Sequence, residues 1–440
     1  MKNNELRTTH RKEILRLAIP NTIENVLQMT VGFVDSLLIA KISLIAISAV
    51  GVVNGLLAIF QAIFIALSIA ATSVIARNIG AKKLNSARVA VFHAILLSVI
   101  VSTFLGLLVL FFGKQILILS GANDEILPLA QHFFLLVGGL SVFWSILTVL
   151  GAVLRANGDA KTPMYVSLLV NLINILLDYL LIFGVGSLPP LGIIGAGVGT
   201  TLSRLIGCII LFRKLQRTKL KIDKNVLKTK ESIAKMIKLS IPSAIERFMM
   251  RFGDILINRL LLNLGTMLFA SLTIFENFAS FTFMPAFAVA AATATLVGRE
   301  FGAKNMENVR EIRKESNHIC LLFMLFTALI LCLFGDFFAR AFTENTTALK
   351  FLNQSLPFYA LGLPVLAYSL VDTSALQATG DTKTPMFATT IGMLFIRVTF
   401  VALFCLYFRF QLIGVAIATL LDNFWRAIFL RWTLNKRMIK

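Results

Sequence analysis

Twelve long apolar runs constrain the fold of this chain more than any other feature of its sequence. A helix needs about 20 mostly apolar residues to cross the hydrocarbon core of a bilayer, and each run reaches that length. The runs cover residues 15–40, 47–76, 89–112, 126–154, 163–184, 191–212, 236–262, 268–298, 316–339, 353–377, 385–408 and 411–432. Because backbone groups in lipid must pair within the protein, these runs predict helices rather than open sheets. We therefore expect an all-α polytopic membrane protein.

Composition excludes several other classes. Hydrophobic residues make up 57% of the 440 residues and charged residues 15%, whereas soluble domains average about 45–50% and about 25%. A soluble enzyme is excluded. A membrane-embedded enzyme is also disfavoured, since the sequence carries no Ser/His/Asp, paired-His or Gly-rich phosphate signature.

The net charge of +20 is explained by where the cations lie. Of the 42 Lys and Arg residues, 31 lie on the side of the amino terminus, 5 lie on the other side and 6 lie inside the runs. Cytoplasmic loops carry an excess of Lys and Arg, so both termini are predicted to be cytoplasmic in a multi-pass protein of the cell (inner) membrane. The charge marks topology, and no nucleic-acid partner is expected.

An internal repeat divides the chain into two halves. LRANGDAKTPM at 154–164 recurs as LQATGDTKTPM at 376–386, an offset of 222 with eight of eleven positions identical. ARNIGAKK at 76–83 recurs as GREFGAKN at the same offset. We predict two six-helix lobes related by a parallel repeat, with the substrate path between them. The lobes are expected at 1–212 and 236–440, and a basic cytoplasmic linker at 213–235.

These residues resemble the multidrug and toxic compound extrusion (MATE) family of cation-coupled efflux transporters. The resemblance rests on Pro20 early in the first run, the Gly-Ala-Lys loops after the second and eighth runs, and the Gly-Asp-x-Lys-Thr-Pro loops after the fourth and tenth. It implies twelve helices around a central cavity. It also implies export of amphipathic, often cationic, compounds driven by inward H⁺ or Na⁺.

Polar or small residues form narrow stripes on helices of the amino-terminal lobe. The first run carries Asn21, Asn25, Gln28, Gly32 and Asp35, and the fifth carries Ser167, Asn171, Asn174 and Asp178. The second run adds Asn54, Gln61 and Ser68, seven residues apart. These stripes predict a polar interior in which Gln28, Asn54, Gln61 and Asn171 are candidate cavity residues.

The two acids of these stripes are the leading candidates for cation coupling. Two neighbouring carboxylates in a low-dielectric interior cannot easily both ionise, so the pair can exchange one H⁺ or Na⁺ for a conformational change. At offset 222, Asp35 aligns with Ile257 and Asp178 with Phe400, so the scaffold does not require either acid. The resemblance assigns Asp35, Asn174 and Asp178 to a family cation site. It implies that the carboxylates of Asp35 and Asp178 are candidate ligands of Na⁺.

The carboxy-terminal lobe carries further candidates for cavity or substrate contact. They are Glu246, Arg251, Glu276, Tyr368 and Asp372. Glu246 aligns with Glu24, and this pair is expected to serve the fold near a first helical turn. Tyr368 and Asp372 match a cation site of another branch of the family. We expect Arg251 to pair with Asp254, and Asp422 with Arg426.

The resulting hypothesis is a monomeric secondary active exporter in the lipid bilayer, with drug-like substrates and no cofactor. A flippase of a lipid-linked precursor on the same fold stays open, because Arg247 and Arg251 would suit an anionic cargo. Neither the choice between H⁺ and Na⁺ nor the physiological substrate follows from the sequence.

Overall fold

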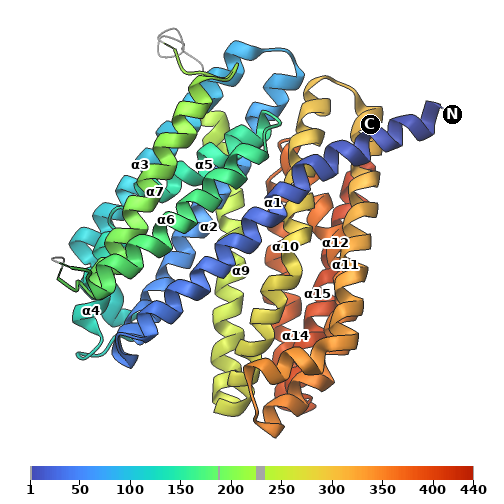
Figure 1. The fold of residues 1–440 in the computed structure, drawn as a ribbon. Helices are drawn as coiled ribbons and strands as arrows, with labels where there is room; N and C mark the ends of the chain where they lie inside the picture. The colour runs from blue at the N-terminus through green and yellow to red at the C-terminus, as the bar shows by residue number, and fades with distance from the viewer. Residues whose placement is uncertain (1, 187–188, 224–232, 440) are drawn as a thin grey trace. The chain divides into compact units, whose positions relative to one another are not determined.

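The computed structural model describes residues 2–186, 189–223 and 233–439, and this part of the chain contains helices and no strands. The chain divides into two compact units (Figure 1). The amino unit consists of Ile23–Lys238, and the carboxy unit consists of Met1–Thr22 with Leu239–Lys440. Of the predicted linker 213–235, residues 224–232 lie outside the described residues, and Arg213 lies within a helix. The two units are described separately below.

The amino unit is built from the second part of one long helix and the helices that follow it. Its helices are α1 (Lys2–Ala40), α2 (Leu44–Gly80), α3 (Leu84–Leu119), α4 (Leu127–Val137), α5 (Val142–Ala156), α6 (Lys161–Phe183) and α7 (Ile193–Gln216). The helix α2 packs against α3, α4 and α5, while α6 packs along α7.

One predicted span of this unit is broken rather than continuous. The run 126–154 forms α4 and α5, which meet at an angle of 44°. The amide groups of Gly138 and Gly139 both donate to the carbonyl of Phe134, and these bonds close the turn. A Cβ on Gly106 of α3 would collide with the carbonyl oxygen of Gly139. The break therefore depends on glycines inside an apolar run, which hydropathy alone does not register.

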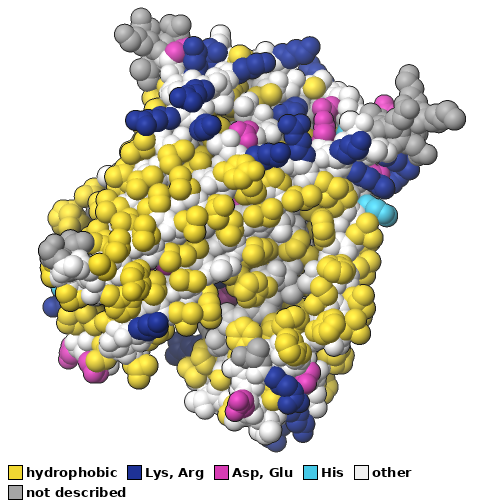
Figure 2. Space-filling model, in the orientation of Figure 1, with side chains coloured by type: hydrophobic (Ala, Val, Ile, Leu, Met, Phe, Trp, Pro, Cys, Tyr) yellow, Lys and Arg dark blue, Asp and Glu magenta, His cyan; other side chains and the backbone are white. Residues whose placement is uncertain are grey.

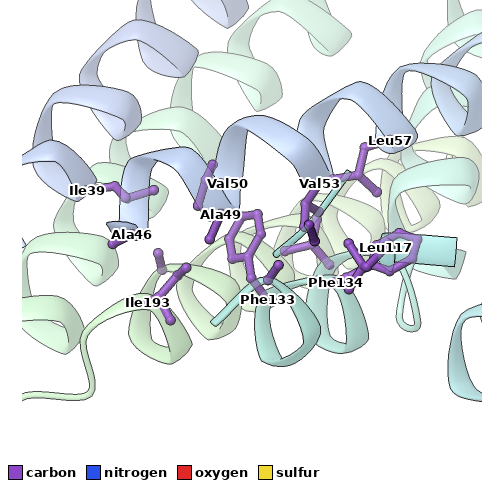
Figure 3. Packing of buried hydrophobic residues seen from close by; sticks show 14 of the residues in the cluster. Ile39, Ala46, Ala49, Val50, Val53, Leu57, Leu117, Phe133, Phe134 and Ile193 are labelled. Atoms are coloured by element: carbon purple, nitrogen blue, oxygen red, sulfur yellow. The ribbon is translucent and has the colours of Figure 1, made fainter. Parts of the chain in front are cut away.

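Buried hydrophobic side chains join the helices of the amino unit. In Figure 3, Val50, Val53 and Leu57 project from α2 toward Phe133 and Phe134. Phe134 lies 6.2 Å from the ring of Phe60. This cluster lies in the half of the unit that holds the loop between α1 and α2, because Ile39 and Ala46 belong to it.

The carboxy unit has the same order of helices. They are α9 (Ala234–Leu264), α10 (Thr266–Gly302), α11 (Met306–Phe342), α12 (Thr346–Ala378), the series α13 (Lys383–Thr390), η1 (Ile391–Val398), α14 (Thr399–Ala402) and η2 (Leu403–Tyr407), and finally α15 (Gln411–Ile439). The helix α12 lies at the centre, since it packs against α10, α11 and α15. Wide π-type turns in η1 and η2 replace the regular helix expected over 385–408, a difference that apolar length does not predict.

The described helices agree with the predicted fold class. Ten of them are long and apolar enough to cross a membrane, and the bent pair α4 and α5 forms one more span. The helix α9 is also long, with 31 residues, but five charged residues between Glu246 and Arg259 interrupt its apolar character. On the face shown in Figure 2, hydrophobic side chains cover the middle of each unit and most Lys and Arg side chains lie toward the helix ends. This distribution is typical of a membrane-spanning protein.

The repeated loops have repeated geometry. Gly158 and Gly380 have φ of 93° and 91°, conformations that favour glycine. After each glycine an aspartate side chain accepts a hydrogen bond from the backbone three residues later, Asp159 from Thr162 and Asp381 from Thr384. Each Gly-Asp pair therefore forms a turn, which agrees with the preference of these residue types for turns.

Candidate functional site

Two acids of the amino unit face each other across a helix pair. The side chains of Asp35 on α1 and Asp178 on α6 lie close enough to interact as a carboxyl pair. Asp178 is 1% exposed, and each residue has an Oδ1 atom with no hydrogen-bond partner. Because ionised carboxylates only accept hydrogen bonds, a bond between the two requires a proton on one of them. The structure brings together the acids of the two predicted stripes.

An arginine that the sequence analysis did not single out completes this group. Arg204 on α7 interacts electrostatically with both Asp35 and Asp178. Its guanidinium carbon lies 4.4 Å from the centre of the Trp144 ring, in cation–π geometry. With both acids ionised the group carries a net charge of one negative unit, and with one proton bound it is neutral.

A signal for Arg204 was present in the sequence. An arginine inside an apolar run is a functional hypothesis by default, and Arg204 aligns with Arg426 at the repeat offset of 222. A count of the cations inside the apolar runs includes Arg204 but shows neither its position in a span nor its alignment with Arg426.

Close packing holds the acid of α6 in place. A Cβ on Gly199 of α7 would collide with Oδ1 of Asp178, so the α7 backbone lies directly against this carboxyl group. A Cβ on Gly195 would likewise meet the backbone of Leu181. Asn174 lies one helical turn before Asp178 and is close enough to interact with its carboxyl group, although its Nδ2 atom lacks a partner at normal hydrogen-bond distance.

The other amino-lobe candidates do not join the acid pair. Gln28 on α1 and both Asn54 and Gln61 on α2 are exposed within their unit. Asn171 is half-buried, and its Nδ2 atom has no partner. Their predicted contact with substrate stays a prediction.

The glutamate pair Glu24 and Glu246 has a structural partner in each unit. Arg155 donates to Glu24 at 2.9 Å, and Gln377 donates to Glu246 at 3.0 Å. Arg155 and Gln377 are themselves related by the offset of 222. The expected location near a first helical turn is wrong, because α1 begins at Lys2 and α9 at Ala234. Each glutamate instead joins its helix to the motif after the fourth or tenth span.

Asp372 on α12 is paired inside the carboxy unit through one of its two carboxylate oxygens, and its buried Oδ2 atom has no hydrogen-bond partner. Asp372 is 0% exposed, and its Oδ1 atom accepts hydrogen bonds from Arg313 at 2.8 Å and Asn317 at 3.3 Å. Arg313 precedes the apolar run 316–339, but α11 begins at Met306 and therefore includes it. Tyr368 lies beneath Arg431, whose guanidinium carbon is 5.2 Å from the ring centre.

Two predicted ion pairs are present in the carboxy unit. Arg426 binds Asp422 through two hydrogen bonds of 2.7 and 2.6 Å. Arg251 and Asp254 lie 3.7 Å apart, with 52% and 31% of their side chains exposed. Glu276 on α10 is half-buried and interacts electrostatically with Asp254 and Arg397.

The described residues contain no group of three or more His, Cys, Asp or Glu side chains that could hold a metal ion. The two carboxyl groups of Asp35 and Asp178 are therefore the only acids at the proposed cation site in this part of the chain. Binding of Na⁺ there stays a prediction.

Comparisons with known proteins agree on one family. The MatE family matches twice, over residues 20–180 and 242–403. The chain is 33% identical to the probable multidrug resistance protein NorM of Thermotoga maritima, over 95% of this chain and 90% of the relative.

Two solved structures share the fold. The outward-facing conformation of a multidrug resistance MATE family transporter superposes with a TM-score of 0.92 at 23% identity, over 99% of this chain and 97% of that one. A transporter of the MOP superfamily from Pyrococcus furiosus, described as having a binding pocket of reverse polarity, superposes with a TM-score of 0.91 at 23% identity, over 98% and 96%. At this identity the structures support the fold, and the family assignment rests on the sequence matches.

Proposed function

Because the chain belongs to the MATE family of multidrug efflux transporters, we propose that it is a secondary active exporter in which the Asp35–Asp178 pair binds the coupling ion. The ion enters from outside and drives amphipathic organic compounds out of the cell by alternating access. The observation that carries this proposal is the carboxyl pair itself, which α1 and α6 form beside Arg204.

The chemistry of the pair favours H⁺ as the coupling ion. A proton converts two repelling anions into a hydrogen-bonded pair. Two unit charges about 4 Å apart repel by roughly 4 kcal/mol at an effective dielectric constant of about 20, so this conversion can move α1 relative to α6. Sodium is less well suited, because Arg204 already supplies a fixed positive charge beside the two acids.

The coupling energy is sufficient for export. One unit of pH difference corresponds to about 1.36 kcal/mol per proton, and one charge crossing 100 mV contributes about 2.3 kcal/mol. Exchange of one proton for one monovalent organic cation moves no net charge, so one pH unit alone supports about tenfold accumulation, and the potential adds to this for an uncharged substrate.

The remaining parts of the proposal concern the cellular setting. We place the protein in the cell (inner) membrane with both termini in the cytoplasm. The reason is that 31 Lys and Arg residues lie on the side of the amino terminus and 5 on the other side. The chain acts as a monomer, since each unit contains its own core and the acid pair lies within a single unit.

The test is transport by purified protein in liposomes with pH and Na⁺ gradients imposed separately. We expect export of a fluorescent organic cation to follow the pH gradient and to be lost in Asp35→Asn and Asp178→Asn. Asp336→Asn serves as the matched control, because this acid of α11 is exposed and pairs with Arg340 of its own helix and Asn353 of α12, away from the proposed site. Gradient-driven export at the wild-type rate in both site variants would overturn the proposal, and transport that follows only Na⁺ would overturn the choice of ion.

A further inference from the structure

Exposed cations gather at one end of the amino unit, where α2 ends, α3 begins and α7 ends. They come from two segments that lie far apart in the sequence, and the proposed coupling site uses none of them. The seven exposed members are Lys82, Lys83, Arg213, Lys214, Arg217, Lys219 and Lys221. We call this group the basic patch. Figure 2 shows Lys and Arg side chains at this end of the unit.

One arginine joins the two segments of the basic patch. Arg88 of α3 donates from Nε to the backbone carbonyl of Lys219 at 2.9 Å, and from Nη1 to the carboxylate of Asp223 at 3.4 Å. Lys83 caps the start of α3, about one and a half helical turns before Arg88. The chain that follows α7 therefore lies against the start of α3, and the two sets of cations share one surface.

The basic patch has no neutralising acid in the described part of the chain. Asp223 is engaged by Arg88, which is not itself a member of the patch. Among the described residues, none of the seven members forms an ion pair. A surface with several cations and no paired acid has a positive potential, so it attracts an anionic partner.

The turn between the two helices does not require this excess of positive charge. Residues 77–93 carry four cations and no acid, whereas the corresponding residues 299–315 carry five cations and four acids. Both copies of the turn have the same left-handed lysine, Lys82 with φ of 58° and Lys304 with φ of 60°. In the carboxy unit, Glu315 pairs with an arginine of α1. The repeat therefore shares the backbone of the turn, and only the amino unit leaves its cations unneutralised.

Exposed apolar side chains adjoin the basic patch on both segments. Phe212 directly precedes Arg213 and is 42% exposed, and Leu84 directly follows Lys83 and is 36% exposed. These residues belong to α7 and α3, which are both long and apolar enough to cross a membrane. A cation beside an exposed apolar side chain at the end of a span lies where the hydrocarbon core meets the lipid headgroups. The anions within reach of the patch are therefore headgroup phosphates.

From this arrangement we infer that the basic patch binds the headgroups of anionic phospholipids, with cations of both segments contacting the same lipid surface. Ammonium and guanidinium groups bind phosphate through charge-assisted hydrogen bonds. Each Lys or Arg close to an anionic membrane surface adds to the attraction, so seven neighbouring cations produce a strong preference over a lipid without net charge. The inference does not depend on which ion or substrate the protein transports.

The test compares three probes on purified full-length protein in a neutral detergent. They are phosphatidylglycerol, phosphatidylcholine with the same acyl chains, and inorganic phosphate. A ligand that binds the folded protein raises its unfolding temperature, so the concentration that gives half of the maximal rise reports affinity. We expect phosphatidylglycerol to act at a concentration at least about tenfold lower than phosphatidylcholine. Inorganic phosphate is expected to have no effect over the same range.

The variants test both segments of the patch. We expect the double variant Lys219→Gln with Lys221→Gln to weaken the effect of phosphatidylglycerol by at least about tenfold, and Lys83→Gln on the other segment by about fivefold. Neither change should alter the effect of phosphatidylcholine. The matched control is Lys41→Gln with Lys114→Gln, because these exposed lysines lie in the same unit beyond the other ends of α2 and α3 or near them.

Each other result would overturn the inference. Equal effects of the two lipids on the wild type would do so whether or not the variants fold. Equal weakening by the patch variants and by the control variant would mean that total charge matters and that the patch is no site. Inorganic phosphate acting at the same concentration as phosphatidylglycerol would assign the patch to a soluble anion instead of a lipid.

Discussion

The contact between Glu24 and Arg155 allows a quantitative test of how the first and fourth spans are joined. The two side chains are 11% and 21% exposed and lie 2.9 Å apart. Removing one partner of a buried ion pair costs about 3–5 kcal/mol, and partial exposure lowers this value. We therefore expect Arg155→Ala to destabilise the amino unit by about 2–3 kcal/mol.

The repeat supplies a graded control for this prediction. Arg155→Gln introduces the residue that Gln377 provides for Glu246 in the carboxy unit. An amide still donates to the carboxylate, so the expected cost is about 1 kcal/mol. Thermal unfolding of purified protein in detergent should rank the wild type above Arg155→Gln, and Arg155→Gln above Arg155→Ala.

A double-mutant cycle with Glu24→Gln isolates the interaction between the two side chains. If the contact contributes as described, Glu24→Gln partly restores the stability of Arg155→Ala, because the unpaired carboxylate is removed. Strict additivity of the two substitutions would refute the reasoning, since it would mean that the pair contributes nothing beyond its separate side chains.

Two further predictions concern glycines. Gly199→Ala places a Cβ against Oδ1 of Asp178, and we expect it to abolish pH-driven export. Gly51→Ala is the control, because a Cβ there has open space, and we expect its transport rate to be unchanged. Equal transport by the two variants would contradict the packing described for α7. Gly158→Ala forces a left-handed conformation on a non-glycine residue, at a cost of about 1–2 kcal/mol. A lowered unfolding temperature would support this, and an unchanged one would not.

Much of the fold could be predicted because lipid imposes simple rules on the sequence. Apolar length located the spans, and the two copies of the Gly-Asp turn located the repeat. The bend at Gly138 and Gly139 was not predictable from hydropathy, since a turn made of glycines remains apolar. The start of α11 was also placed too late, at residue 316 instead of Met306, because a charged extension of a helix has no apolar signal.

The site was only partly predictable. The polar stripes on two helices identified Asp35 and Asp178, because the helical spacing of polar residues alone is enough to place both acids on interior faces. Arg204 was overlooked because a single arginine forms no stripe, although the repeat relates it to Arg426. The ion pair between Asp372 and Arg313 depends on how α11 packs against α12, and no local pattern in the sequence predicts it.

Proton exchange on substrate binding tests the central claim most directly. Purified protein in weakly buffered detergent solution is mixed with a non-titrating organic cation, and the change in pH is recorded. The account predicts that the wild type and Asp336→Asn release protons, and that Asp35→Asn and Asp178→Asn release none. Equal proton release by all four proteins would contradict the claim that the Asp35–Asp178 pair holds the coupling ion.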